Sequence, residues 1–431
     1  MRAREIFLLL LLIAGGVFLT HLYNDRLYWH LDWDEGILFT GDEFSFDETL
    51  EVPTPPPSEV TIDNTNGNVT VVGGGADHIT IQMTKRLWKQ EKSEAEELAN
   101  QIHILTETED GTLKISAGMD QLRERSFHTD FHVSLPEGTP VIVGNTYGSV
   151  DISGTGVTEI SNNSGRVIAA DIRGDLKLAN RKGGIEAKDI AGRCVIDSRD
   201  ESVRLSHIVG PVEISHGYGK ILLEDIQHEV KIRGNDSQIV GHVLRGGVDI
   251  ENDHEKIELF EIGPSVINTS HGMVEINGLQ GNLDLKNRFS KVKLNQIRGD
   301  ISIAGKDLEV RAKNLRGAIG ISTSYKVIDL SDFAGKTVIS MSDGKVTLTP
   351  APLTHPIEVT SKNSDIKLFW PGSEKYPLEA RSEGGDIQWE IPFQVDSRKE
   401  NGLSQIKAFF SEDQNPAIRL ATTYGTIRIE N

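Results

Sequence analysis

The sequence predicts an all-β protein whose main body is a parallel β-solenoid (β-helix) of coils about 18 residues long. Three observations support this fold class: an aliphatic position returns every 17 or 18 residues, a glycine recurs with it, and no segment of helical period separates the units. Repeats without helices cannot be βα units. Each strand must therefore pair with its equivalent in the next coil, at a spacing of about 4.8 Å.

The repeat consists of two aliphatic columns and one glycine column. The first column is entirely β-branched: Val150, Val167, Ile185, Val203, Ile221, Ile239, Ile257, Val274, Val292, Val310, Ile328 and Val346. The second column contains Ile172, Ile190, Ile208, Ile226, Leu244, Ile262, Leu279, Ile297, Leu315 and Phe333. Two residues after most of these come Gly174, Gly192, Gly210, Gly246, Gly281, Gly299, Gly317 and Gly335.

Polar residues complete the predicted coil. The glycines and the series Asn162, Asn180, Ser198 and Asn252 are expected at turns, where Gly and Asn tolerate positive φ. Glu213, Lys231 and Asp249 fall at one outward position of three successive coils, as opposite charges on neighbouring strands. We expect a right-handed coil from the general crossover rule.

The chain is predicted to contain five segments: a membrane anchor or signal segment (1–24), an acidic and aromatic region with a Pro-rich linker (25–58), an amino-terminal β region (59–137), the regular solenoid (138–350) and carboxyl-terminal coils with insertions (351–431). A capping helix is expected at about 93–104, because Ser93 can cap it and Glu96 follows three residues later. Solenoids need caps over their open strand edges. At the carboxyl end we assign this task to insertions that hold Trp370, Trp389, Phe393, Phe409 and Phe410.

The amino terminus predicts a link to a membrane. Arg2 and Arg4 precede an uninterrupted apolar run from Ile6 to Thr20, which approaches the ~20 residues that cross a bilayer. A cleaved signal peptide is the alternative. We favour an uncleaved anchor, because the apolar run continues beyond Ala14-Gly15-Gly16. The arginines then predict a single-pass protein of the cytoplasmic membrane with its body exported, periplasmic or extracellular.

Composition excludes some partners. The net charge of −19 argues against nucleic acid, since phosphate binding needs clustered Lys and Arg. The single cysteine, Cys194, excludes an intrachain disulfide and a Cys-based metal cluster. Cys194 occupies the core position that Val212, Val230 and Val248 fill in later coils, so we expect a buried, unreactive thiol.

We predict no catalytic residue, no cofactor-binding residue and no metal ligand. Six histidines are expected at different places in the coil, where stacking does not bring them together: His207, His216, His228, His242, His254 and His271. The acidic corners 197–201 and 249–255 lack the ligand spacing of a known calcium loop. The coils from Gly148 to Gly344 are too short to form the long-loop groove of a polysaccharide lyase or hydrolase.

The repeat units resemble those of the bacterial putative-adhesin family of unknown function, whose members are exported β-solenoids. The resemblance covers roughly residues 59–431 and rests on units such as Asn162–Val167 and His271–Ile276, and on the stretch Val133–Gly138 before the array. It carries no catalytic residues. It implies adhesion or envelope association, and some relatives belong to envelope-stress systems.

From these features we expect a non-catalytic, membrane-anchored solenoid that acts as an adhesin-like or protein-interaction scaffold for an envelope component. The alternatives are an envelope-stress or antimicrobial-peptide sensor, which an acidic surface would suit, and a polysaccharide-active enzyme. No cofactor is expected.

Overall fold

The computed structural model describes residues 29–32, 37–52, 57–74, 77–118, 127–391, 393–409 and 417–431. The chain divides into two compact units, residues 1–166 and 167–431, which are described separately. The membrane or signal segment predicted at residues 1–24 lies outside the described residues. Within the described ranges, no helix is both long enough and apolar enough to span a membrane.

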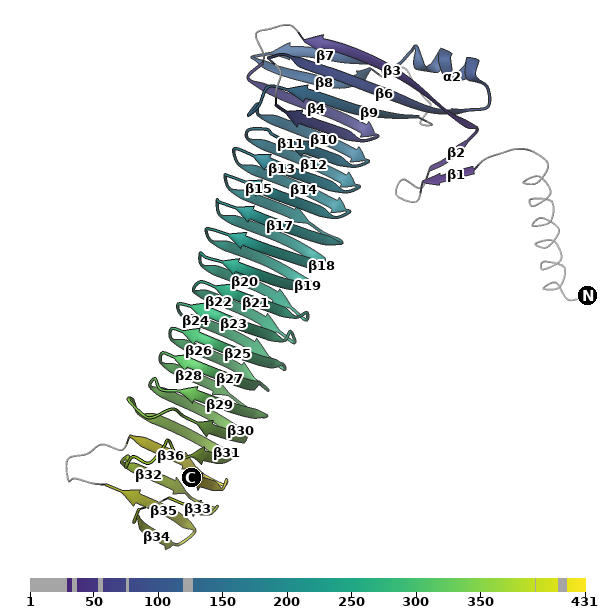
Figure 1. The fold of residues 1–431 in the computed structure, drawn as a ribbon. Helices are drawn as coiled ribbons and strands as arrows, with labels where there is room; N and C mark the ends of the chain where they lie inside the picture. Colours follow the sequence, from purple (N-terminus) through teal and green to yellow (C-terminus); the bar gives the residue numbers. More distant parts are fainter. Residues whose placement is uncertain are drawn as a thin grey trace, which may run out of the picture. The chain divides into compact units, whose positions relative to one another are not determined.

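The first unit is built almost entirely of strands (Figure 1). Its strands are β1 (Trp29–Asp32), β2 (Ile37–Thr40), β3 (Asp42–Val52), β4 (Glu59–Asn66), β5 (Val69–Gly73), β6 (Ile79–Lys89), β7 (His103–Glu109), β8 (Thr112–Gly118), β9 (Phe127–Leu135), β10 (Val141–Tyr147), β11 (Val150–Ser153) and β12 (Thr158–Ser164). The pair β4–β5 forms a coil between two others: it pairs in parallel with β8–β9 on one side and with β10–β11 on the other.

Antiparallel strands extend the first unit beyond its last coil. β6 pairs with β9 and with β3, and β7 forms a hairpin with β8. The predicted helix is present as α2, but it spans Lys92–Ala99 rather than 93–104. Glu91, and not Ser93, is its N-cap residue, and the chain enters β7 at His103 because that strand must pair with β8.

Helix α2 packs on the antiparallel strands and not on the open edge of a coil. It buries Ala95, Leu98 and Ala99. The Lys85 ammonium on β6 donates to the carbonyl of Ala99 (3.1 Å) and pairs with Glu48 on β3 (2.7 Å). The helix therefore stabilises the antiparallel strands β3 and β6, and it is these strands that cover the open edge of the last coil.

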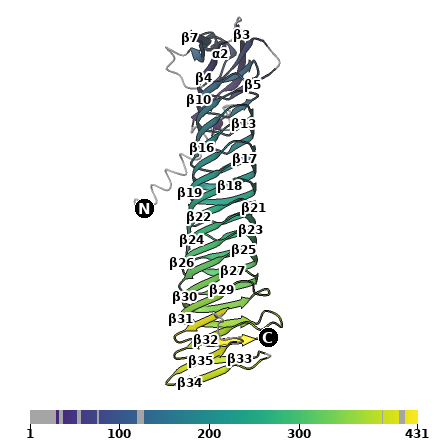
Figure 2. The same cartoon turned by 90° about the vertical axis from the view of Figure 1, so that its left-hand side faces the viewer.

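The second unit contains two parallel ladders (Figures 1 and 2). Its strands are β13 (Val167–Ile172), β14 (Leu176–Lys182), β15 (Ile185–Ile190), β16 (Cys194–Ser198), β17 (Ser202–Ile208), β18 (Val212–Ile226), β19 (Val230–Leu244), β20 (Val248–Asp253), β21 (Ile257–Ile262), β22 (Ser265–Ser270), β23 (Val274–Gln280), β24 (Leu283–Arg288), β25 (Lys291–Arg298), β26 (Ile301–Lys306), β27 (Glu309–Arg316), β28 (Ile319–Thr323), β29 (Val327–Phe333), β30 (Thr337–Thr349), β31 (Ile357–Phe369), β32 (Leu378–Ser382), β33 (Ile387–Trp389), β34 (Asp396–Glu400), β35 (Leu403–Ala408), β36 (Ile418–Thr422) and β37 (Ile427–Glu430).

The predicted register is confirmed. Val167 pairs with Ile185, Ile185 with Val203, and the first aliphatic column continues in this way to Val346. The outward residues Glu213, Lys231 and Asp249 face one another in the order expected. The fold class is therefore an all-β, parallel solenoid; the right-handed sense stays a prediction.

The glycine column lies at corners between strands as expected, but most residues with positive φ come from a different column. Positive φ occurs one residue before the second aliphatic column, at Asp171, Asp189, His207, Asp225, Val243, Glu261, Gly278, Gln296, Asn314 and Asp332. The predicted polar turn residues Asn162, Asn180, Ser198 and Asn252 are instead buried near the ends of strands. Asn180 donates to the carbonyl of Gly183 (3.0 Å) and Asn252 to that of Ser237 (2.8 Å), so this buried column satisfies turn carbonyls that water cannot reach.

The carboxyl-terminal coils are present, but not in the order of the sequence. β36 lies between β31 and β32 and pairs in parallel with both, and β37 lies likewise between β31 and β33 (Figure 1). The hairpin β34–β35 then pairs with β32 and closes the end. β34 is exposed throughout, and all of its residues except Ser397 are charged, which is a common protection of an edge strand.

The aromatic cap predicted for this end is only partly correct. Trp370 is buried and packs edge-on against Phe393, with ring centroids 5.2 Å apart. Trp389 and Phe409 are exposed instead, because the hairpin β34–β35 already covers the edge. Phe410 lies outside the described residues.

Candidate functional site

Most residues that the sequence offered as candidates for chemistry have structural roles in the fold. Cys194 is fully buried beside Val212, and burial raises the pKa of its thiol to about 12. In the acidic corner at residues 249–255, Asp249 and Glu251 both pair with Arg233. Across the described ranges, no group of three or more His, Cys, Asp or Glu side chains could hold a metal ion.

His216 is one of the buried residues and not a surface histidine. It takes the place of Asn in the inward column, is 4% exposed, and contacts the carbonyl of Glu201 through Nε2 (3.1 Å). Its Nδ1 has no hydrogen-bond partner. Burial lowers the pKa of His216, and the charge of Asp200 opposes this only in part.

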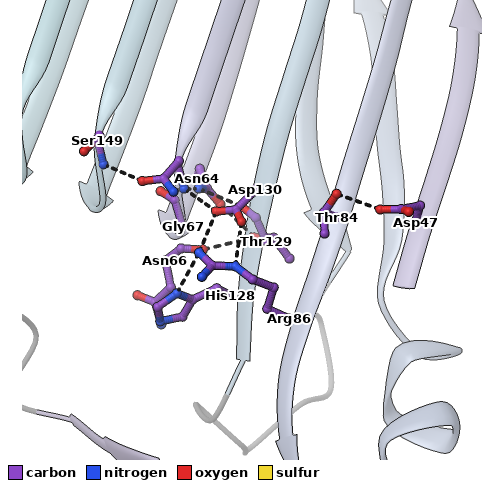
Figure 3. A network of polar contacts seen from close by, with 11 residues as sticks. Asp47, Asn64, Asn66, Gly67, Thr84, Arg86, His128, Thr129, Asp130 and Ser149 are labelled. Carbon is purple, nitrogen blue, oxygen red and sulfur yellow. Dashed lines mark hydrogen bonds and ion pairs between the residues drawn. The ribbon is translucent and has the colours of Figure 1, made fainter. Parts of the chain in front are cut away.

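A polar network in the first unit also has a structural task (Figure 3). Arg86 on β6 pairs with Asp130 on β9 (2.6 Å), and Asp130 accepts from the backbone N–H of Asn68 (2.7 Å). Asn64 donates to the carbonyls of Gly67 and Thr129. These groups satisfy one turn and join it to the cap.

The expectation that stacking keeps the histidines apart is wrong for one pair. His254 and His271 stack with ring centroids 5.2 Å apart, and His271 stacks in turn on Phe289 (5.4 Å). The reason is a coil of 17 residues: Leu244 pairs with Ile262 at a separation of 18, but Ile262 pairs with Leu279 at 17. The missing residue falls at the Gly263-Pro264 corner and brings positions 254 and 271 into one column.

Phe289, the last ring of this column, lines a groove of about 930 Å³. The groove crosses the ends of β20, β22, β24 and β26, which follow one another in Figure 1. Its inward wall is made of polar and small residues, Asn252, Thr269, Asn287 and Gly305. Gly305 lies where two coils approach closely, since a Cβ there would clash with the carbonyl oxygen of Asn287.

Three cations line the outer wall of the groove: Lys286, Arg288 and Lys306. All three are exposed, and within the part of the chain that the structure describes none of them forms an ion pair. Arg288 and Lys306 are direct neighbours across β24 and β26, where like charges repel. The two acids of the groove are engaged elsewhere, Glu251 with Arg233 and Asp253 with the amide and hydroxyl of Ser270.

A second, larger groove of about 1010 Å³ follows another corner of the same coils. It also contains arginines, but Arg245 pairs with Asp225 (3.3 Å) and Arg316 with Asp332 (3.0 Å). Of the three arginines in this second groove, only Arg298 has no ion-pair partner among the described residues. The first groove is therefore the better candidate site, because it combines unpaired cations with exposed rings.

The fold and this surface define an all-β parallel solenoid with a groove that an exposed ring and three cations line. Residues 249–430 match the family described as Toastrack DUF4097. The match includes most of the groove, and the resemblance to the putative-adhesin family of unknown function is confirmed.

Two solved structures are similar at a distance. One is described as a putative cell adhesion protein from Clostridium sporogenes (9% identity, TM-score 0.21, 90% of this chain and 99% of that chain covered). The other is described as a putative adhesin from Parabacteroides distasonis (11% identity, TM-score 0.25, 65% and 98% covered). No curated protein matches the chain.

Proposed function

We propose that this chain is a non-catalytic, adhesin-like solenoid that is held at the cell envelope and binds an envelope component through its side. The observation that carries this proposal is the groove beside the His254, His271 and Phe289 column, where exposed rings and unpaired cations meet on a rigid scaffold. Binding sites on rigid strands keep their geometry at little entropic cost.

The proposed location is the cytoplasmic membrane, with the body exported. It rests on Arg2 and Arg4 before the apolar run Ile6–Thr20, and on the positive-inside rule. Secretion after cleavage of this segment is the alternative. Either location presents the solenoid to envelope polymers or proteins.

A non-catalytic role is supported by how acidic side chains are used. Hydrolysis of a glycosidic bond needs a pair of carboxyl groups held at a defined separation around the substrate. In the groove, Asp253 already accepts two hydrogen bonds from Ser270 and Glu251 is paired with Arg233. They are therefore not arranged as a free acid and base.

The test is cosedimentation of the full-length protein with purified envelope fractions, with sugar release measured in parallel. We expect retention on a polysaccharide or envelope-protein fraction without formation of free sugars. Release of sugar products would replace the proposal with an enzyme. Binding of cationic peptides alone would favour the sensor, which the net charge of −19 would suit.

A further inference from the structure

The groove at the ends of β20, β22, β24 and β26 has the chemistry of an anion-binding site on an acidic protein. Lys286, Arg288 and Lys306 are exposed and unpaired within the described residues, although the chain as a whole has 64 acidic against 45 basic side chains. Most other cations near these coils are neutralised; Lys291, for example, pairs with Glu309 and Lys256 with Glu258. The three groove cations are thus a local exception.

In the protein without a ligand, repulsion between the groove cations lowers the stability of the fold. Arg288 and Lys306 face each other on neighbouring strands, at a spacing of about 4.8 Å. Like charges directly opposite one another in a sheet are destabilising. A bound carboxylate or phosphate would remove this repulsion and form charge-assisted hydrogen bonds with both side chains.

The groove also offers a surface for rings. Phe289 is 50% exposed, and its φ of 57° places it at the corner, where it continues the stack of His254 and His271. An exposed aromatic face beside polar groups suits a flat ligand that has an apolar face and a polar edge, as a sugar ring has.

Two further features fit a polar ligand. Thr269 lines the groove, is 7% exposed, and its hydroxyl has no hydrogen-bond partner. This hydroxyl is itself buried, so it adds polar character to the wall of the groove and is not an exposed contact. Asn268 lies beside Lys286 on the neighbouring strand and provides an amide at the same wall.

We propose that this groove binds an acidic polysaccharide, with a sugar ring stacked on Phe289 and with carboxylate or phosphate groups held by Lys286, Arg288 and Lys306. The four strand ends span about 14 Å at the spacing of paired strands, which suits a short stretch of an extended polymer. The proposal rests on the proposed adhesin-like function and names the ligand class of that site.

The test measures binding of the full-length protein to alginate, which carries carboxylates, to phosphomannan, which carries phosphates, and to neutral mannan. Polyglutamate serves as a polyanion without sugar rings. We expect salt-sensitive binding of alginate or phosphomannan and no binding of neutral mannan. The two acidic glycans distinguish carboxylate from phosphate as the recognised group.

The triple change Lys286→Gln, Arg288→Gln and Lys306→Gln should weaken this binding at least about tenfold, because each removes a charged contact. Phe289→Ser should weaken binding of acidic glycan about tenfold and leave binding of polyglutamate unchanged. The matched controls are Arg204→Gln, Lys220→Gln and Lys231→Gln together, which remove the same charge from exposed sites outside the groove, and Tyr424→Ser, which removes an exposed ring. Both controls should bind within about twofold of the parent.

Three outcomes would overturn the proposal. One is acidic-glycan binding that the groove variants leave intact, and the second is equal loss in the control triple. The third is polyglutamate binding as strong as glycan binding and indifferent to Phe289→Ser, which would make the ligand an acidic peptide. Cosedimentation with envelope fractions that survives the groove changes would preserve the adhesin-like function while removing this assignment.

Discussion

At the scale of single residues, the position of a side chain within the coil determines whether it is buried or exposed, and so what role it has. Position 216 belongs to the inward column of Asn180 and Asn252, so the histidine there is buried, whereas His228, in the corner between β18 and β19, is exposed. Cys194 behaves as one more member of an aliphatic column. Residue type alone would have assigned reactive roles to both His216 and Cys194.

Burial of His216 makes the stability of the fold depend on pH. Its pKa in the folded state lies below the unfolded value of 6.5, so the unfolded chain takes up the proton first. The contribution is fully present above about pH 6.5 and is lost as the pH falls below that value, by up to about 1.4 kcal/mol per pH unit. Melting curves from pH 8 to pH 5 should therefore show a smaller decline for His216→Asn than for the parent.

The exposed His228 provides the control for this measurement. His228→Asn should follow the parent curve at every pH, because its side chain is in water in both states. Identical curves for His216→Asn and the parent would show that burial of His216 has no part in the acid response.

A charge at an inward aliphatic position should disrupt the stack locally. Ile250 is fully buried, and Ile250→Asp places an unpaired carboxyl in the core at a cost of about 3–5 kcal/mol. We expect a lower melting temperature and faster hydrogen exchange in the flanking strands β19 and β22, which pair with β20. Ile250→Val should cost only about 0.5–1.5 kcal/mol.

Unaltered stability of the Ile250→Asp variant would contradict the register of the strands. Unchanged melting of Ile250→Asp would mean that position 250 faces solvent, and the pairing of Ile232, Ile250 and Ile267 would then be wrong.

At the scale of elements, contacts between neighbouring coils set which residues fit. The recurring glycines lie where one coil approaches the next most closely. A Cβ at Gly317 would lie 2.1 Å from the carbonyl oxygen of Gly299, while a Cβ at Gly320, three residues on, would meet nothing nearer than 3.7 Å. The glycine column is therefore a requirement of close approach between backbones.

Gly317→Ala should separate these two coils and destabilise the protein by about 1–3 kcal/mol, as other overpacking changes do. Gly320→Ala is the matched control and should be neutral or slightly stabilising, since alanine loses less chain entropy than glycine. Thermal or denaturant unfolding measures both. Equal melting of the two variants would contradict the close contact at Gly317.

The inserted coil at the carboxyl end makes that end depend on the last strands of the chain. Removal of residues 417–431 takes away β36 and β37, and β31 and β32 then lose their shared partner. We expect residues 370–409 to become sensitive to limited proteolysis, with exposed edges that promote aggregation. Arg419→Gln, at an exposed position of β36, should leave the cleavage pattern unchanged.

A truncated protein that resists proteolysis as well as the parent would contradict this dependence. It would mean that β31 and β32 can pair with each other directly or stand alone.

At the scale of the whole molecule, composition follows from the repeat. A thin core of aliphatic columns explains why only 6% of residues are aromatic and why glycine is frequent, with 42 residues. Stability in such repeats is approximately a sum over neighbouring units. The net charge of −19 leaves most of the surface acidic, which is why a groove with three unpaired cations is distinctive.

The sequence by itself determined the fold class and the register of the second unit. Columns from Val167 to Val346 are read directly from spacing, because a parallel solenoid repeats one local pattern and places equivalent residues beside one another. The buried position of Cys194 followed from the same rule. The sequence also indicated that a helix follows β6, although its end at Ala99 depended on the pairing of β7 with β8.

The tertiary structure alone decided the order of the coils at both ends and the candidate site. Nothing local in β36 specifies that it enters between β31 and β32, because pairing between distant segments is selected by edges that exist only in the folded chain. The stack of His254, His271 and Phe289 depends on one residue missing at the Gly263-Pro264 corner, a signal visible in the spacing of Ile262 and Leu279 once the coils are aligned. Short-range sequence patterns determine the strands and corners of each coil, whereas contacts with neighbouring coils determine which side chains lie together at its surface.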